Sequence, residues 1–154
     1  MKGKEENIGY RLLIACGGAL MLVAVAVELL AVLGRLVGLP LPGSIELVQI
    51  AVTISGTCAL LVATLHGSHA RVRLVLDRLS ASQLHVMNRA NALCSAVFFL
   101  MFCAGSTWLM VDLWNGFEES EIWFVPYRPL RLWVILGTLA VALVFLASLR
   151  EKRS

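Results

Sequence analysis

Residues 39–79 read LPLPGSIELVQIAVTISGTCALLVATLHGSHARVRLVLDRL, and this stretch decides the fold. It contains a proline-rich turn, an apolar segment over residues 45–65 and a basic segment. A helix of roughly 20 apolar residues spans the hydrocarbon core of a bilayer, which is about 30 Å thick. The stretch therefore predicts a transmembrane helix between a tight turn and a positively charged loop.

The composition of the whole chain is typical of a membrane protein. Of its 154 residues, 59% are hydrophobic and only 15% are charged, and the mean hydropathy is +0.84. A soluble domain of this length cannot bury so much apolar surface. Segments long enough to cross a bilayer lie at about residues 12–37, 45–65, 81–114 and 130–149. We therefore expect an all-α integral membrane protein with four transmembrane helices in a single membrane domain, residues 1–154.

The basic residues predict how the helices are oriented. On one side of the predicted helices lie Lys2, Lys4, Arg11, Arg71, Arg73, Arg78, Arg89, Arg150, Lys152 and Arg153. The opposite side has only Arg35, Arg128 and Arg131. Because cytoplasmic loops carry the excess of Lys and Arg, both termini are expected in the cytoplasm. The first apolar run is too long for a signal peptide and is expected to be a retained anchor. The net charge of +3 then reflects topology, and no nucleic-acid partner is expected.

The loops carry recognisable capping signals. Ser44 is predicted to cap the helix over residues 45–65, and Glu46 lies in its first turn, at the positive end of the helix dipole. The segment after His66 alternates apolar and basic residues and is predicted to be amphipathic and to lie along the membrane surface. Ser80 and Gln83 have capping-box spacing. The helix that follows them is longer than the bilayer needs, so it is expected to tilt or to project into the cytoplasm.

The second apolar helix has two unusual stripes. A small-residue stripe allows another helix to approach closely, and a polar stripe about a third of a turn away is poorly suited to lipid. These stripes consist of Ser55, Ala59 and Ala63, and of Gln49, Thr53 and Thr57. We expect this helix to contact protein on both sides, in a larger membrane partner or, alternatively, in a second copy of the chain.

Glu28 is an unexpected residue in a membrane anchor. It lies in the outer half of the first predicted helix, on a face with Ala24, Ala31 and Arg35. A carboxylate at that depth is costly unless it is paired, hydrated or protonated. It is interpreted as a polar contact in a helix interface or, alternatively, as part of a proton or ion relay. Arg35, about 10 Å further along the axis, is hypothesised to pair with Glu46 across the proline turn.

Together these elements resemble the small membrane subunit of tripartite ATP-independent periplasmic (TRAP) transporters, the DctQ-like family. The elements are Arg35, the Pro40-Leu41-Pro42-Gly43-Ser44 turn, Glu46, Gly56 and the loop Gly67-Ser68-His69-Ala70-Arg71-Val72. The resemblance makes His69 and Arg71 candidate structural or interface residues. One position departs from the family pattern, because Arg73 stands where the family usually has an Asp.

The resemblance implies a place in a three-part secondary transporter of the bacterial inner membrane. The partners would be a large membrane subunit, which holds the substrate and sodium sites, and a periplasmic solute-binding protein. The small subunit would brace the scaffold for sodium-driven uptake of an organic acid or a similar solute, with no catalytic site or cofactor of its own. The loop between the last two helices carries acids that are candidate contacts for the binding protein, namely Glu118, Glu119 and Glu121.

An alternative is a small anchor or accessory subunit of another complex, such as a haem anchor of a respiratory enzyme. The histidines argue against it, because His66, His69 and His85 lie at or beyond the inner ends of the predicted helices. The cysteines lie inside the predicted helices without a CxxC pair and are interpreted as packing residues. They are Cys16, Cys58, Cys94 and Cys103.

Overall fold

The computed structural model describes residues 8–66, 80–116 and 119–150. Within this part of the chain the fold is all-helical, with helices α1 (Ile8–Leu36), α2 (Ser44–His66), α4 (Ala81–Asp112) and α5 (Tyr127–Arg150). All four are long and apolar enough to cross a membrane. The predicted all-α fold with four transmembrane helices is therefore confirmed.

The helix bounds differ from the predicted ones mainly at the starts of α1 and α5. Helix α1 begins at Ile8, and α5 begins at Tyr127 rather than after Pro129. Proline is tolerated in the first turn of a helix because its missing N–H has no intrahelical partner there. The predicted capping box of α4 is confirmed, since the Ser80 hydroxyl accepts from the Gln83 N–H and the Gln83 side chain accepts from the Ser80 N–H.

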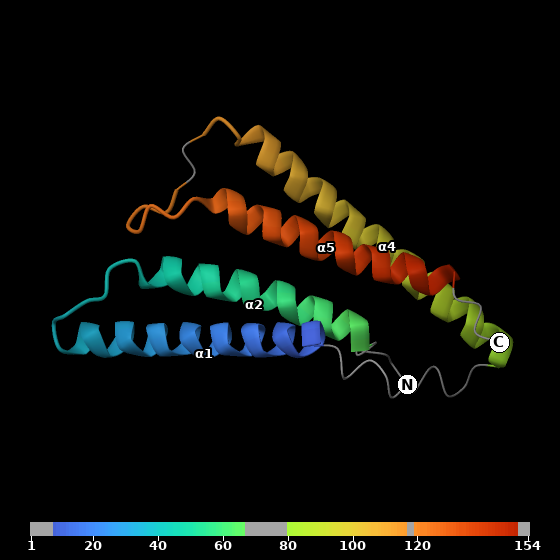
Figure 1. Ribbon diagram of the computed structural model, residues 1–154, viewed down its shortest axis with the longest axis horizontal. Helices are drawn as coiled ribbons and strands as arrows, with labels where there is room; N and C mark the ends of the chain where they lie inside the picture. Colours follow the sequence, from blue (N-terminus) through green and yellow to red (C-terminus); the bar gives the residue numbers. More distant parts are fainter. Residues whose placement is uncertain (1–7, 67–79, 117–118, 151–154) are drawn as a thin grey trace.

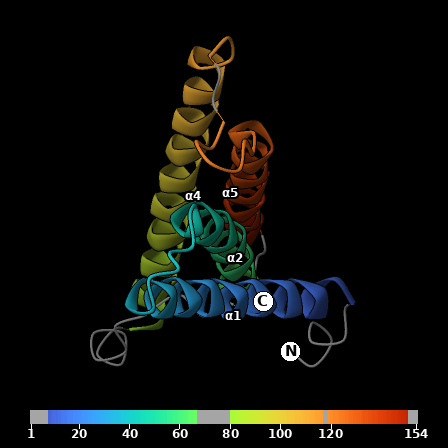
Figure 2. The same cartoon turned by 90° about the vertical axis from the view of Figure 1, so that its left-hand side faces the viewer.

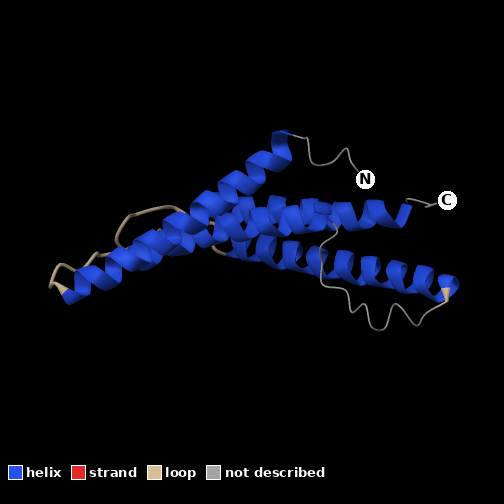
Figure 3. Cartoon of the chain, turned by 90° about the horizontal axis from the view of Figure 1, so that it is seen from below, coloured by secondary structure: helices blue, strands red, loops and turns tan. Residues whose placement is uncertain are grey.

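The four helices form two antiparallel hairpins, α1–α2 and α4–α5, which pack together through α2 and α5 (Figure 1). The main contacts follow the order α1, α2, α5, α4, so the helices form an open row. Figure 2 views the row from the end where α2 and α5 begin, and α2 lies between α1 and α5. Figure 3 shows α1 crossing the other helices obliquely. We name the end where α2 and α5 begin the Glu46 end, and the opposite end the His66 end.

Helix α1 contacts α2 through a heptad pattern of small residues. Gly17, Ala24 and Ala31 are buried and lie seven residues apart. The half-buried positions between and beside them are Tyr10, Leu13, Leu20, Val27 and Gly34, and every other residue of α1 is exposed. An apolar seven-residue repeat is the pattern of helices that pack side by side, and small side chains bring their backbones close. Most of α1 therefore faces away from the other described helices.

Small residues also bring α5 against α2. A Cβ at Gly137 of α5 would collide with the methyl group of Thr57. Val141 and Ala142, one turn further along α5, are fully buried. On the other side of α5, the ring of Phe145 stacks on Phe99 of α4 with centroids 6.0 Å apart.

Helix α4 is the longest helix, with 32 residues, or about 48 Å. Figure 1 shows its first turns extending beyond the last turn of α2. The helix thus projects past its neighbours at the His66 end, as its length predicts. The predicted amphipathic segment after His66 lies outside the described residues.

Candidate functional site

The Glu46 end is organised around one carboxylate. Glu46 lies in the first turn of α2 and accepts three hydrogen bonds from the loop that joins α4 to α5. The donors are the Ser120 hydroxyl, the N–H of Ile122 at 3.1 Å and the N–H of Trp123 at 3.2 Å. We name these four residues the Glu46 clamp. It fastens the second hairpin to the first.

The clamped loop is folded tightly on itself. The N–H of Ser120 donates to the carbonyl of Val125 at 3.0 Å, and the N–H of Phe124 donates to the carbonyl of Ser120 at 3.1 Å. Ser120 is only 1% exposed, although its neighbours in the loop are mostly open. Phe124 has φ = 52°, which is uncommon for a residue with a bulky side chain. The surrounding hydrogen bonds therefore hold Phe124 in an unfavourable backbone conformation.

Gly43 allows the loop to approach the turn between α1 and α2. Its φ is +74°, and a Cβ at this position would collide with the indole of Trp123. The carbonyl of Gly43 accepts from the N–H of Leu47 at 3.2 Å, and α2 begins at Ser44 itself. The predicted cap at Ser44 is thus displaced by one residue. Glycine fits this capping position because it combines the left-handed conformation with room for the indole.

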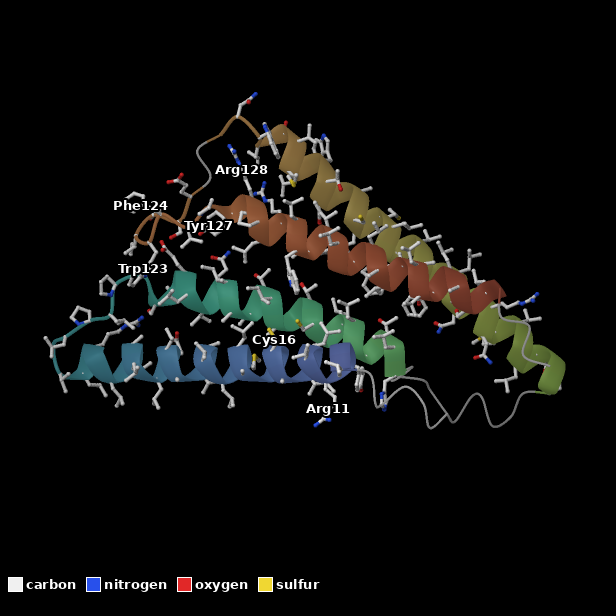
Figure 4. The ribbon with its side chains drawn as sticks, in the orientation of Figure 1. Arg11, Cys16, Trp123, Phe124, Tyr127 and Arg128 are labelled. Atoms are coloured by element: carbon white, nitrogen blue, oxygen red, sulfur yellow. The ribbon has the colours of Figure 1, made fainter. Side chains whose placement is uncertain are left out.

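The clamp presents an apolar tip. Ile122, Trp123 and Phe124 are exposed, with Phe124 at 71% and Trp123 at 50%. Figure 4 shows Phe124 at the far edge of the loop and Trp123 beside the α1–α2 turn. Two exposed acids, Glu119 and Glu121, precede this tip in the sequence. Glu118, the third candidate contact for the binding protein, lies outside the described residues.

Two arginines of α5 stabilise the C-terminal end of α4. The guanidinium of Arg128 donates to the carbonyl of Trp114 at 2.7 Å and lies 5.1 Å from the centre of the Trp114 ring. Arg131 donates to the carbonyl of Leu109 at 3.3 Å. Cations are favourable at this negative end of a helix dipole. The two arginines thus hold the start of the loop that joins α4 to α5, and Figure 4 shows Arg128 beside it.

The structure separates the residues of the predicted small-residue stripe. Ser55 is buried and donates to the carbonyl of Gly17 at 2.8 Å, so it belongs to the contact with α1. Ala59 is exposed and Ala63 is half-buried. In the polar stripe, Thr53 and Thr57 donate to carbonyls of their own helix, while the side chain of Gln49 is exposed.

The three charged residues of α1, Arg11, Glu28 and Arg35, are all exposed. Glu28 and Arg35 lie beside the buried row of small residues and not within it. In the described part of the chain, no ion pair joins Arg35 to Glu46, whose carboxylate binds the loop instead. The hypothesised pairing across the proline turn is therefore not what the structure contains.

At the His66 end, a hydrogen bond links the first turn of α1 to the last turn of α2. The Tyr10 hydroxyl lies 2.8 Å from Nδ1 of His66, and the two rings stack. His69 and Arg71 lie outside the described residues. Among the residues that are described, no group of three or more His, Cys, Asp or Glu side chains could hold a metal ion.

Ser120 and Gly17 are site residues that sequence reasoning missed, and Gly43 was predicted only as a member of the proline-rich turn. Ser120 is one polar residue among three glutamates, and nothing near it in the sequence distinguishes it as a contact of Glu46. Gly43 carries a usable signal, because a glycine directly before a helix and after a proline is a common turn residue. Gly17 belongs to a seven-residue repeat with Ala24 and Ala31 that can be found in the sequence.

Comparison with known protein families gives one match. A family model described as "Tripartite ATP-independent periplasmic transporters, DctQ component" matches residues 24–154. The match includes the clamp, the proline turn and three complete helices. No curated protein and no solved structure matches the chain.

Proposed function

We propose that this chain, which belongs to the DctQ family of TRAP transporter components, braces the large membrane subunit of such a transporter. A DctQ component is part of a transporter and not an enzyme, so the chain's role is to be sought in its surfaces. The tripartite system supplies the expected partners, a large membrane subunit and a periplasmic solute-binding protein.

The observation that best supports a bracing role is the Glu46 clamp. It joins the two hairpins at one end, where α2 meets the loop before α5. The helices nevertheless form an open row, and α1 and α4 keep most of their surface exposed. A row that is fixed at one end and open along its sides can support a larger neighbour while that neighbour moves.

The orientation follows from the basic residues. With both termini in the cytoplasm of a bacterial cell, the Glu46 end faces the periplasm. A fusion of green fluorescent protein to the C-terminus is expected to fluoresce, and a fusion of alkaline phosphatase there is expected to be inactive. The reverse pair of results would contradict this orientation in the inner membrane.

In this orientation the clamped loop is where the binding protein docks. Glu118, Glu119 and Glu121 precede the apolar tip in the sequence, and Glu119 and Glu121 are exposed. Contacts between charged surfaces raise association rates and weaken as salt rises. Neutralising the three acids together is expected to remove the salt dependence of docking, measured with the purified binding protein on the reconstituted complex. Unchanged salt dependence would reject a role for the acids.

The transported solute in this proposal is an organic acid or a similar molecule, and sodium drives its uptake. The choice of solute and the coupling to sodium are properties of the whole complex, because this chain contributes only surfaces that brace and dock its partners. Uptake of labelled solute into proteoliposomes, with and without a sodium gradient, tests the coupling ion. Uptake that is indifferent to sodium would reject it.

Purification with its partners is the direct test of the proposed function. The chain is tagged, extracted from its native membrane in a mild detergent, and its bound partners are identified by mass spectrometry. Recovery of a large polytopic permease near 1:1, with a periplasmic binding protein among weaker partners, is the expected result. Recovery with respiratory enzymes, or alone, would contradict the proposal.

A further inference from the structure

The α1–α2 pair has one flank that no described residue covers. Residues that directly follow the half-buried heptad positions of α1 share this flank, and all of them are exposed. They are Ile14, Met21, Glu28 and Arg35. Helices α1 and α2 run antiparallel and pack through seven-residue repeats. In such a pair, residues at the same position of the repeat in the two helices lie on the same side.

Helix α2 has a matching exposed stripe on that side. Its spacing alternates between four and three residues, which is the spacing of a helix-packing surface. The stripe consists of Ile45, Gln49, Val52, Gly56, Ala59 and Ala63, of which only Ala63 is half-buried. The opposite flank of α2, with Leu47, Ile54 and Leu61, is half-buried throughout. We name the surface between the α1 flank and this stripe the open groove.

The floor of the open groove is made of small residues. A Cβ at Gly56 would meet no atom within 4 Å, and Ala59 next to it is exposed. In membranes, helices associate where small residues let their backbones approach, because lipid supplies no hydrophobic driving force between them. The floor therefore leaves room for the backbone of another helix.

Polar groups make the open groove unsuited to lipid. Glu28 contributes a carboxylate from α1 and Gln49 an amide from α2, both inside membrane-spanning helices. No described residue gives either side chain a hydrogen-bond or ion-pair partner. Unsatisfied polar groups are costly in hydrocarbon, so the groove calls for a neighbour that supplies hydrogen-bond donors.

The exposed face of α4 provides a contrast. It carries the bulky apolar residues Phe98, Met101, Phe102 and Trp108, together with exposed polar and small residues such as Asn91 and Gly105. The four bulky side chains are satisfied by lipid tails alone. Around these four side chains the surface of α4 therefore differs in chemistry from the open groove.

We infer that a transmembrane helix of the large subunit packs into the open groove, with a hydrogen-bond donor facing Glu28 and Gln49. This inference rests on the proposed function, which supplies the partner, and adds the surface and the chemistry of the contact. The occupant is a helix with small residues along its contacting side and at least one donor side chain in its outer half.

Photo-cross-linking of the intact complex tests which surface is occupied. A photoreactive phenylalanine analogue is placed at Met21, on the rim of the groove, or at the adjacent Leu22, on the back of α1. Both positions are exposed. The analogue at Met21 is expected to cross-link to the large subunit, and the analogue at Leu22 is not.

Other results have distinct meanings. Cross-links from Leu22 but not Met21 would overturn the groove while leaving the proposed function intact. Cross-links from Met21 to a second copy of this chain would overturn the inference in favour of self-association. If the unmodified chain retains no large subunit, the proposed function itself fails.

Substitution of matched alanines provides a second test. Ala59→Leu fills the floor of the groove, whereas Ala26→Leu adds the same atoms to an exposed position on the back of α1. Overpacking is expected to lower the amount of large subunit retained by Ala59→Leu roughly tenfold, while Ala26→Leu retains the wild-type amount. Equal retention by both variants would overturn the inference. Size-exclusion profiles of the two variants establish that both are folded.

Discussion

The Glu46 carboxylate accepts a hydrogen bond from the hydroxyl of Ser120, which lies 74 residues later in the chain. The same carboxylate binds the N–H groups of Ile122 and Trp123. One side chain of the first hairpin thus orders a turn of the second. The interaction also explains why a buried serine stands in an otherwise exposed loop.

Removing the carboxylate is expected to loosen the loop and leave the helices in place. In Glu46→Ala, chymotrypsin should cut beside Trp123 and Phe124 several-fold faster than in the wild type, because three hydrogen bonds to the loop are lost. Ser120→Ala should have a smaller effect, because the N–H groups of Ile122 and Trp123 can still donate to Glu46. Glu119→Gln, an exposed neighbour, is the control. Cleavage of Glu46→Ala at the wild-type rate would contradict the clamp.

Two glycines of the α1–α2 turn allow the energetic cost of a strained backbone to be measured separately from the cost of a steric collision. Gly38 and Gly43 have φ values of +76° and +74°, but only Gly43 faces another side chain. Gly38→Ala should cost about 1 kcal/mol of unfolding free energy, from the left-handed conformation alone. Gly43→Ala should cost more, because the indole of Trp123 must also move. Thermal unfolding in detergent measures both, and equal losses would argue against the contact with Trp123.

Adjacent glycines of α1 test its packing on α2. A Cβ at Gly17 would lie 3.1 Å from the Cβ of Cys58, whereas one at Gly18 would meet nothing within 4 Å. Gly17→Leu is expected to destabilise the chain by about 1–3 kcal/mol through overpacking. Gly18→Leu is expected to be neutral or to stabilise the helix by up to about 1 kcal/mol. The same effect of both substitutions on unfolding would mean that α1 does not pack on α2 through Gly17.

The contact between the two hairpins can be tested by rescue. Gly137→Ala should destabilise the chain, because the new methyl group collides with that of Thr57. Thr57→Ser removes this methyl group and keeps the hydroxyl that donates to the carbonyl of Thr53. The double variant should regain about 1 kcal/mol relative to the sum of the single effects. Gly105→Ala, at an open position of α4, is the control, and strict additivity would contradict the α2–α5 contact.

The helices were predictable from sequence because their signals are local. Apolar length located all four spans, and the spacing of Ser80 and Gln83 predicted the capping box of α4. Helix α5 begins three residues before the predicted position 130, because the first turn of a helix accepts a proline such as Pro129.

The clamp was not predictable, because its partners are distant in the sequence. Glu46 has a favourable place in the helix dipole whether or not it binds Ser120, and Arg35 is a nearer opposite charge. The choice between them depends on how the second hairpin packs against α2. That packing is set by Thr57 and Gly137, whose contact has no local signal.

The clamp also has a consequence for the order of assembly. Ribosomes add about 5–20 residues per second, so Ser120 emerges roughly 4–15 s after Glu46. During that interval the first hairpin is held by contacts within itself, chiefly those of Gly17, Ala24 and Ala31 with α2. The two hairpins therefore join only after the first has been made, and a ribosome stalled before residue 120 leaves a nascent chain in which Glu46 lacks its partners in the loop.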